Sequence, residues 1–154
     1  MRYMFYECNL LISLNLTMFN TSKVKNMDLM FYGCSSLTTL DLNNFKTCNV
    51  KVMANMFYLC SSLISLNIDN FNTSLVEDMR FMFYECNLLI SLNLSMFDTS
   101  KVKYMWCMFC GCSSLTTLDL SNFRTSNARD RGNMFHGCSS LISLNIDNFD
   151  TSLV

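Results

Sequence analysis

The sequence predicts an α/β repeat protein, a solenoid in which every repeat contributes a short β-strand and a short helical arc. Composition agrees with this, because the chain of 154 residues is 51% hydrophobic and can bury a core. Periods of about 20 to 50 residues are typical of solenoids, in which each repeat packs only against its neighbours. The strongest observation is a fixed period of 26 residues, which six of the nine cysteines follow. The dipeptide Met-Phe shows the same period, at Met4, Met30, Met56, Met82, Met108 and Met134.

The period divides the chain into six repeats that form one predicted solenoid domain, at 4–29, 30–55, 56–81, 82–107, 108–133 and an incomplete 134–154. The first and fourth repeats are identical at 21 of 26 aligned positions, which indicates that a block of three repeats was duplicated. Solenoids usually end in atypical capping repeats, and none is recognisable in this chain. We therefore expect a fragment of a longer array, whose uncapped ends promote self-association.

The second repeat illustrates both predicted elements. Over 37–43, Leu40 and Leu42 alternate with polar residues, as in a half-buried strand. Six such strands would stack as a parallel β-sheet on one face of the solenoid. Over 50–60 the apolar residues mostly recur at a spacing of three, which is typical of a short α- or 3₁₀-helical arc on the other face.

The combined pattern resembles a known family at the level of the repeat. Leu-x-x-Leu-x-Leu-x-x-Phe followed by Thr-Ser-x-Val-x-x-Met-x-x-Met-Phe-x-x-Cys resembles the BspA-type leucine-rich repeat of microbial surface proteins, and the resemblance extends from Met4 to Val154. It implies a right-handed leucine-rich-repeat solenoid, display on the outside of the cell, and a role in adhesion or host interaction. The family has no catalytic residues to transfer.

The fifth repeat departs from the pattern at 127–132. Ala128 replaces the valine of the other repeats, and Arg131 replaces the methionine. Because a guanidinium is not buried without partners, we expect this arc to be locally displaced, with Arg131 directed to solvent.

Several classes of function are excluded or disfavoured by composition. A net charge of −1 with only 15% charged residues argues against a nucleic-acid binder. No apolar run reaches the length of a membrane span. With the single histidine His136 at a position otherwise occupied mostly by tyrosine, we expect no enzyme activity and no cofactor.

The cysteines allow two alternatives. Cys107, Cys110, Cys112 and His136 form a weak candidate for a metal or redox site, although core packing and sporadic replacement explain them better. The repeated cysteines from Cys8 to Cys138 are either bridged between repeats or, as we prefer, reduced thiols in the core. Cysteine usage therefore leaves the compartment open. We expect the cell surface or secretion, with the export signal outside this chain; the alternative is the cytoplasm.

The remaining candidate for function is the polar face of the strands, with hydroxyl, amide and carboxylate groups and no aromatic residue. Because binding hot spots favour Trp, Tyr and Arg, we expect a weak or multivalent interaction with a protein or extracellular-matrix ligand. The alternative function is an intracellular leucine-rich-repeat scaffold or regulatory protein. The candidate binding residues are Thr39, Asp41, Asn43, Asn67, Asp69, Asn93, Thr117, Asp119, Asn145 and Asp147.

Overall fold

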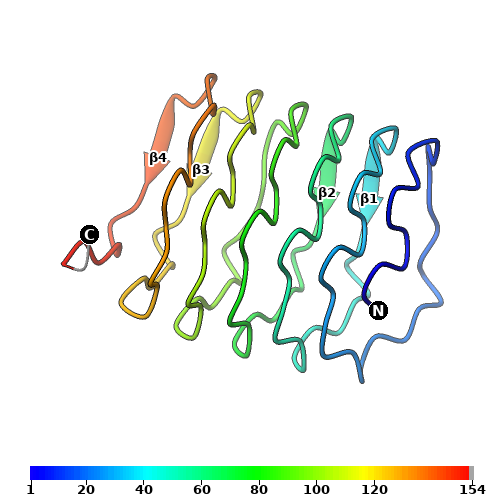
Figure 1. Ribbon diagram of the computed structural model, residues 1–154, viewed down its shortest axis with the longest axis horizontal. Coiled ribbons are helices and arrows are strands. Elements are labelled where there is room, and N and C mark those ends of the chain that lie inside the picture. The colour runs from blue at the N-terminus through cyan, green and yellow to red at the C-terminus, as the bar shows by residue number, and fades with distance from the viewer. Residues whose placement is uncertain (153–154) are drawn as a thin grey trace.

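The computed structural model describes residues 1–152 as a row of stacked coils, with the two ends of the chain at opposite ends of the row (Figure 1). We number the coils one to six after the predicted repeats. Four strands occur in this part of the chain, namely β1 (Thr39–Asp41), β2 (Ser65–Asn67), β3 (Thr117–Asp119) and β4 (Ser143–Asn145). β1 pairs with β2 and β3 with β4, both in parallel, so that each residue faces its equivalent in the next coil. Parallel strands in a repeat architecture are thereby confirmed.

The prediction of six strands in one sheet is wrong for coils one and four. The two strand pairs form separate sheets, and coil four lies between them (Figure 1). Between coils two and three, the amide of Leu42 donates to the carbonyl of Asn67 at 2.9 Å. Between coils four and five, the Nδ2 of Asn122 donates to the carbonyl of Leu94 at 2.9 Å. The equivalent side-chain amide of Asn70 also donates between coils two and three, to the carbonyl of Asn43 at 3.1 Å, so this bond occurs with or without the backbone ladder.

The predicted helical arcs are also wrong, because residues 1–152 contain no helix. The arc is a series of tight turns, in which the amides of residues 30, 32 and 34 donate to carbonyls three residues back. The alternate amides, of Met27, Leu29, Phe31 and Gly33, instead donate to carbonyls of the next coil at 2.8–3.1 Å. A helix would keep these bonds within the segment. A spacing of three fits both structures, since it is also the span of a turn's hydrogen bond.

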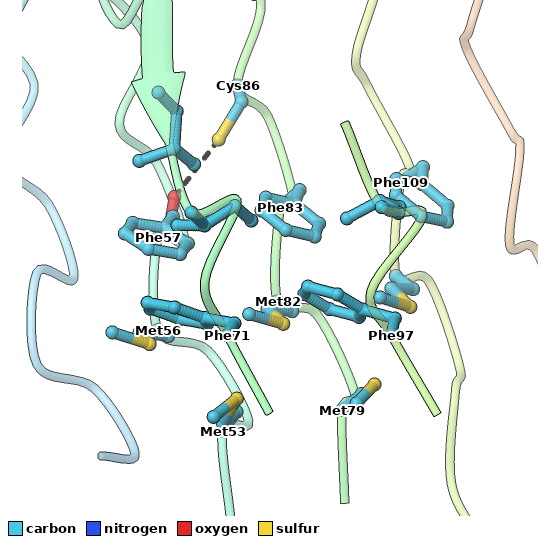
Figure 2. Packing of buried hydrophobic residues seen from close by; sticks show 14 of the residues in the cluster. Met53, Met56, Phe57, Phe71, Met79, Met82, Phe83, Cys86, Phe97 and Phe109 are labelled. Atoms are coloured by element: carbon cyan, nitrogen blue, oxygen red, sulfur yellow. Dashed lines mark hydrogen bonds between the residues drawn. The ribbon is translucent and has the colours of Figure 1, made fainter. Parts of the chain in front are cut away.

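The hydrophobic core lies between the strands and these turns and consists of columns of identical side chains. Phe31, Phe57, Phe83 and Phe109 are fully buried, and their rings stack at centroid distances of 5.5–5.7 Å. Methionine columns lie beside them (Figure 2). Each coil therefore repeats the packing of its neighbour, which explains why the period has no insertion.

A buried threonine in each corner holds the next coil. Thr21, Thr47, Thr73, Thr99 and Thr125 are all buried. The hydroxyl of Thr73 donates to the carbonyl of Asp98 at 2.9 Å and accepts from the amide of the same residue at 2.8 Å. Every corner residue that meets a threonine must therefore have an N–H group. Proline lacks this group, which accounts for its exclusion from these positions.

The expectation of a displaced arc at Arg131 is wrong. Ala128 is buried, and residues 129 and 130 keep their backbone pairing with the preceding coil. The Nη1 of Arg131 donates to the hydroxyl of Thr125 at 2.9 Å and to the carbonyl of Asp150. The guanidinium thus finds polar partners along the corner, and the backbone has no need to move.

Candidate binding face

Nine of the ten predicted binding residues lie in the strands or in the turns that follow them, and the tenth lies in a coil without a strand. Thr39 and Asp41 lie in β1, Asn67 in β2, Thr117 and Asp119 in β3, and Asn145 in β4, with Asn43, Asp69 and Asp147 in the turns that follow. Asn93 lies in coil four outside any strand, and its Nδ2 donates to Asp69 Oδ1 at 3.0 Å. The continuous polar grid expected from the sequence is therefore interrupted.

Many of these side chains stabilise the backbone at the end of the strand. Asp41 Oδ1 accepts from the amide of Asn43 at 3.0 Å, and Asp119 Oδ1 accepts from the amide of Ser121 at 2.9 Å. These are Asx turns, in which the side chain bonds to the backbone two residues ahead. The bonds from Ser121 lower the pKa of Asp119 below its usual value. The polar column thus has a structural role in addition to any binding role.

Two hollows in this face occupy equivalent places, three repeats apart in the sequence. One lies between coils one and two with a volume of about 440 Å³, and the other lies between coils four and five with about 260 Å³. Both occur where the strand ladder is missing. The first is lined by Leu14, Asn15, Leu16, Thr17, Asp41, Asn43 and Asn44, and the second by Leu92, Asn93, Leu94, Ser95, Asp119, Ser121 and Asn122.

The chemistry of the hollows is that of hydrogen bonding. The Nδ2 of Asn44 donates to the carbonyls of Leu16 and Thr17 at 2.9 and 3.2 Å. The Nδ2 of Asn122 makes the equivalent bonds in the second hollow. Hydroxyl, amide and carboxylate groups complete the lining, and neither hollow is lined by His, Cys, Lys or Arg. Such a site offers donors and acceptors to a polar ligand.

Asn44 and Asn122 are absent from the residues predicted from the sequence. The signal that identifies them is the duplication of three repeats, together with a local difference that coils one and four share. Asn9-Leu10 and Asn87-Leu88 stand where the other coils have Ser-Ser. The Oδ1 of Asn87 is buried without a hydrogen-bond partner. This substitution marks the coils that lack a strand.

The four residues of the candidate metal site are not brought together as ligands. Within residues 1–152, no three side chains of His, Cys, Asp or Glu are grouped so as to hold a metal ion. Cys112 lies in the core, and its Sγ donates to the carbonyl of Phe83 at 3.1 Å. Cys107 and Cys110 are buried one turn earlier, whereas His136 is exposed in the next coil. Core packing describes the cysteines better than metal binding.

The cysteine column is a ladder of thiols. Each Sγ from Cys34 to Cys138 donates to a phenylalanine carbonyl of the preceding coil at 3.1–3.2 Å, and the bond from Cys86 to Phe57 is drawn in Figure 2. All nine cysteines are free, so the bridged alternative is not seen. Burial raises the pKa of Cys34 to about 11 and that of Cys86 well above its usual value. These thiols stay neutral near pH 7.

Comparisons with known proteins identify a repeat family. A family model described as "Mycoplasma protein of unknown function, DUF285" matches residues 1–87 and again 61–154. The two matches overlap and together include the whole chain, as expected of an array of similar units. No curated protein matches the chain significantly. Residues 1–152 contain no helix of the length and apolar character required to span a membrane.

Proposed function

The chain belongs to the DUF285 family, and from this premise we propose that it is a non-enzymatic adhesion module of a microbial surface protein of the BspA type. Its ligand is a protein of the extracellular matrix or of a host surface. Display at the cell surface and a right-handed leucine-rich-repeat solenoid are parts of the same proposal.

The observation that supports binding is the pair of equivalent hollows. They are three coils apart, and parallel strands repeat at about 4.8 Å, so the hollows are separated by about 14 Å. An extended peptide rises about 3.3 Å per residue, so a segment of roughly five residues reaches from one hollow to the other. Two weak contacts on one ligand strengthen each other, because the second is made at high effective concentration.

The lining of the hollows suits an extended polypeptide. Peptide groups present one donor and one acceptor per residue, and the hollows present carbonyls, amides and carboxylates in return. Neither lining includes an aromatic residue or an arginine, so each hollow by itself binds weakly. Affinity then depends on the use of both hollows.

Blocking each hollow tests this proposal. Asn43 and Ser121 are equivalent residues, one in each lining. We expect Asn43→Arg and Ser121→Arg each to weaken binding to immobilised fibronectin, laminin or type I collagen about tenfold, and the double variant to weaken it about a hundredfold. Surface plasmon resonance measures these affinities.

The matched control is Ser139→Arg, which adds the same charge and bulk at an exposed turn position of coil six, outside both hollows and beyond the stretch of strand face between them. It should bind as the unmodified chain does. The proposal fails if none of the three matrix proteins binds, or if the control loses as much affinity as the hollow variants.

A further inference from the structure

Cationic residues gather in one corner of coils one, two, four and five, whereas the same corner of coil three has none. The corner comprises 20–25 and the equivalent stretches 46–51, 72–77, 98–103 and 124–129, which we call the basic strip. Eight of the 11 Lys and Arg residues lie in it with only two acidic residues, Glu77 and Asp98, which gives it a formal charge of +6. The other three cations and ten acidic residues leave the rest of the chain at −7. The near-zero net charge conceals this separation.

Backbone hydrogen bonds hold the charged side chains in line. The amide of Lys51 donates to the carbonyl of Lys25, and the same bond links Glu77, Lys103 and Arg129 in turn, each at 2.8–2.9 Å. Since neighbouring strand-like segments lie about 4.8 Å apart, these five residues form a row about 19 Å long. One charged side chain per coil is thus fixed at a regular interval.

Most cations of the strip have no acidic partner. Outside the strip, Arg2 pairs with Asp28 at 2.8 Å and Arg80 with Asp78 at 2.7 Å. Of the salt bridges that the structure describes in residues 1–152, only one joins two residues of the strip, Lys103 and Glu77, at 2.5 Å. The potential of the remaining cations is therefore not cancelled locally, and this excess of positive charge attracts an extended anion.

A hollow in the strip marks the place where several of these groups converge. It is lined by Lys101, Lys103, Arg129, Asn127 and Glu77. Three cations and an amide surround it, against one carboxylate that is already paired with Lys103. This arrangement suits an anionic group such as a sulfate ester.

We propose that the basic strip binds a linear sulfated polysaccharide. This inference rests on the proposed function, because display at the cell surface would bring the strip into contact with such glycans. Grooves that bind single-stranded nucleic acid combine cations with aromatic residues on which bases stack, and the strip contains no aromatic residue. Membrane-surface segments have an apolar face beside their cations, whereas each coil of the strip directs its Thr and Val or Ala inward. A narrow strip with two cations in each of coils one, two, four and five fits a linear polyanion.

Heparin is the probe for this proposal, measured by isothermal titration with the whole chain at about 0.15 M salt, where exposed charges are partly screened. We expect the double variant Lys101→Gln/Arg129→Gln to bind heparin about tenfold more weakly, because two exposed charge contacts are lost. The matched control, Arg2→Gln/Arg80→Gln, removes the same charge outside the strip and should leave heparin affinity unchanged. Raising the salt concentration should weaken binding of the unmodified chain.

A second pair of variants tests the strip in the opposite direction. Glu77→Gln removes the acidic residue at the centre of the row and should increase heparin affinity about threefold, whereas Glu7→Gln makes the same change of net charge elsewhere and should have no effect. The proposal is overturned if heparin does not bind, if the controls behave like the strip variants, or if single-stranded DNA or anionic vesicles bind equally well with the same dependence on the variants. Failure of the hollow variants against matrix proteins, with heparin binding intact, would count against the proposed function alone.

Discussion

The turn side and the strand side of this array hold successive coils together in different ways. On the turn side, the phenylalanine amide of every coil from Phe5 to Phe109 donates to the methionine carbonyl of the next coil at 2.9–3.0 Å. A row of parallel bridges also runs without a break from Asn26 to Asp130. On the strand side, residues 1–152 form only two separate strand pairs, β1 with β2 and β3 with β4.

This difference indicates where the cohesion of the array lies. The column of Phe31 and its equivalents and the methionine and cysteine columns belong to the turn side, so hydrogen bonds and burial act there together. The strand side is stabilised by buried leucines, by Asx turns and by asparagine amides, and it is open where the hollows occur. An array with one uniform side retains freedom to vary the other, which is where we place the binding site.

Alkaline pH should destabilise the protein through the thiols of the turn side, and we expect this to be the largest of the effects. Folding raises the pKa of the buried ladder thiols above the ordinary value of 9.0, to about 11 for Cys34 and further for Cys60, Cys86 and Cys112. A raised pKa in the folded state contributes stability that is complete below pH 9 and is lost as pH rises toward the folded value. At pH 10 each such thiol costs on the order of 1 kcal/mol, and the ladder thiols together cost several kcal/mol.

Urea unfolding at pH 7.5 and pH 10 measures this loss. Cys86→Ala lowers stability at pH 7.5 but should reduce the further loss between the two pH values by on the order of 1 kcal/mol, because one of the seven thiols whose pKa folding raises is gone. Cys48 is exposed, so Cys48→Ser should leave the loss unchanged. Equal alkaline sensitivity in all three proteins would show that the ladder thiols are not its source.

The next largest effects are expected from core substitutions, whose cost in stability should differ between the turn side and the strand side. Phe83 is fully buried and stacks between Phe57 and Phe109, so we expect Phe83→Ala to cost about 4 kcal/mol in free energy of unfolding. On the strand side, Leu118 is buried in β3, and Leu118→Ala should cost about 3 kcal/mol. Leu92 occupies the same position in coil four but is only partly buried, so Leu92→Ala should cost about 1 kcal/mol.

Urea unfolding of the three variants gives these values. The comparison between Leu118 and Leu92 is the sharper one, because the two residues are exactly equivalent in the repeat and differ in whether their coil has a paired strand. A loss for Leu92→Ala as large as for Leu118→Ala would mean that coil four is as firmly packed on its strand side as its neighbours.

The fold was predictable as far as side-chain repetition defines it. A residue that recurs once in every repeat has the same surroundings in each coil, so Phe57, Met56 and Cys60 could be assigned to the core from the sequence alone. The helical arcs were wrong because the spacing of three does not distinguish a helix from successive turns. Left-handed backbone at Leu29 and Phe81, with φ of 58° and 56°, has no counterpart in residue type.

The candidate site was predictable in part. The sequence places Asp41 and Asp119 on the polar face, and both line a hollow. It does not show that the ladder is interrupted beside them, where the side-chain amides of Asn44 and Asn122 bond to the carbonyls of Leu16 and Leu94. The net charge of the whole chain also hid the basic strip, because it sums the strip with an acidic remainder. Sorting the charged residues by their position within the repeat separates the two.

The smallest expected effect concerns backbone conformation within a single column of the turn side. Gly33, Gly111 and Gly137 adopt a φ of 70–77°, and Leu59 occupies the same place at 57°. Side chains at such angles cost about 1–2 kcal/mol in L-residues. A Cβ on Gly111 would also lie 2.8 Å from the Cδ of Glu85, a flexible group that has room to move. Gly111→Ala should therefore cost about 1–2 kcal/mol.

The reverse change at Leu59 tests the same cause from the other side. Leu59→Gly removes the left-handed strain but adds freedom to the unfolded chain, which offsets about half of the gain. Because Leu59 is 37% exposed, Leu59→Ala serves as the reference for the lost side chain. We expect Leu59→Gly to be about 0.5–1 kcal/mol more stable than Leu59→Ala in thermal unfolding. If alanine were the more stable of the two, the turns would tolerate left-handed residues at no cost, and tight-turn geometry would not explain why glycine recurs in this column.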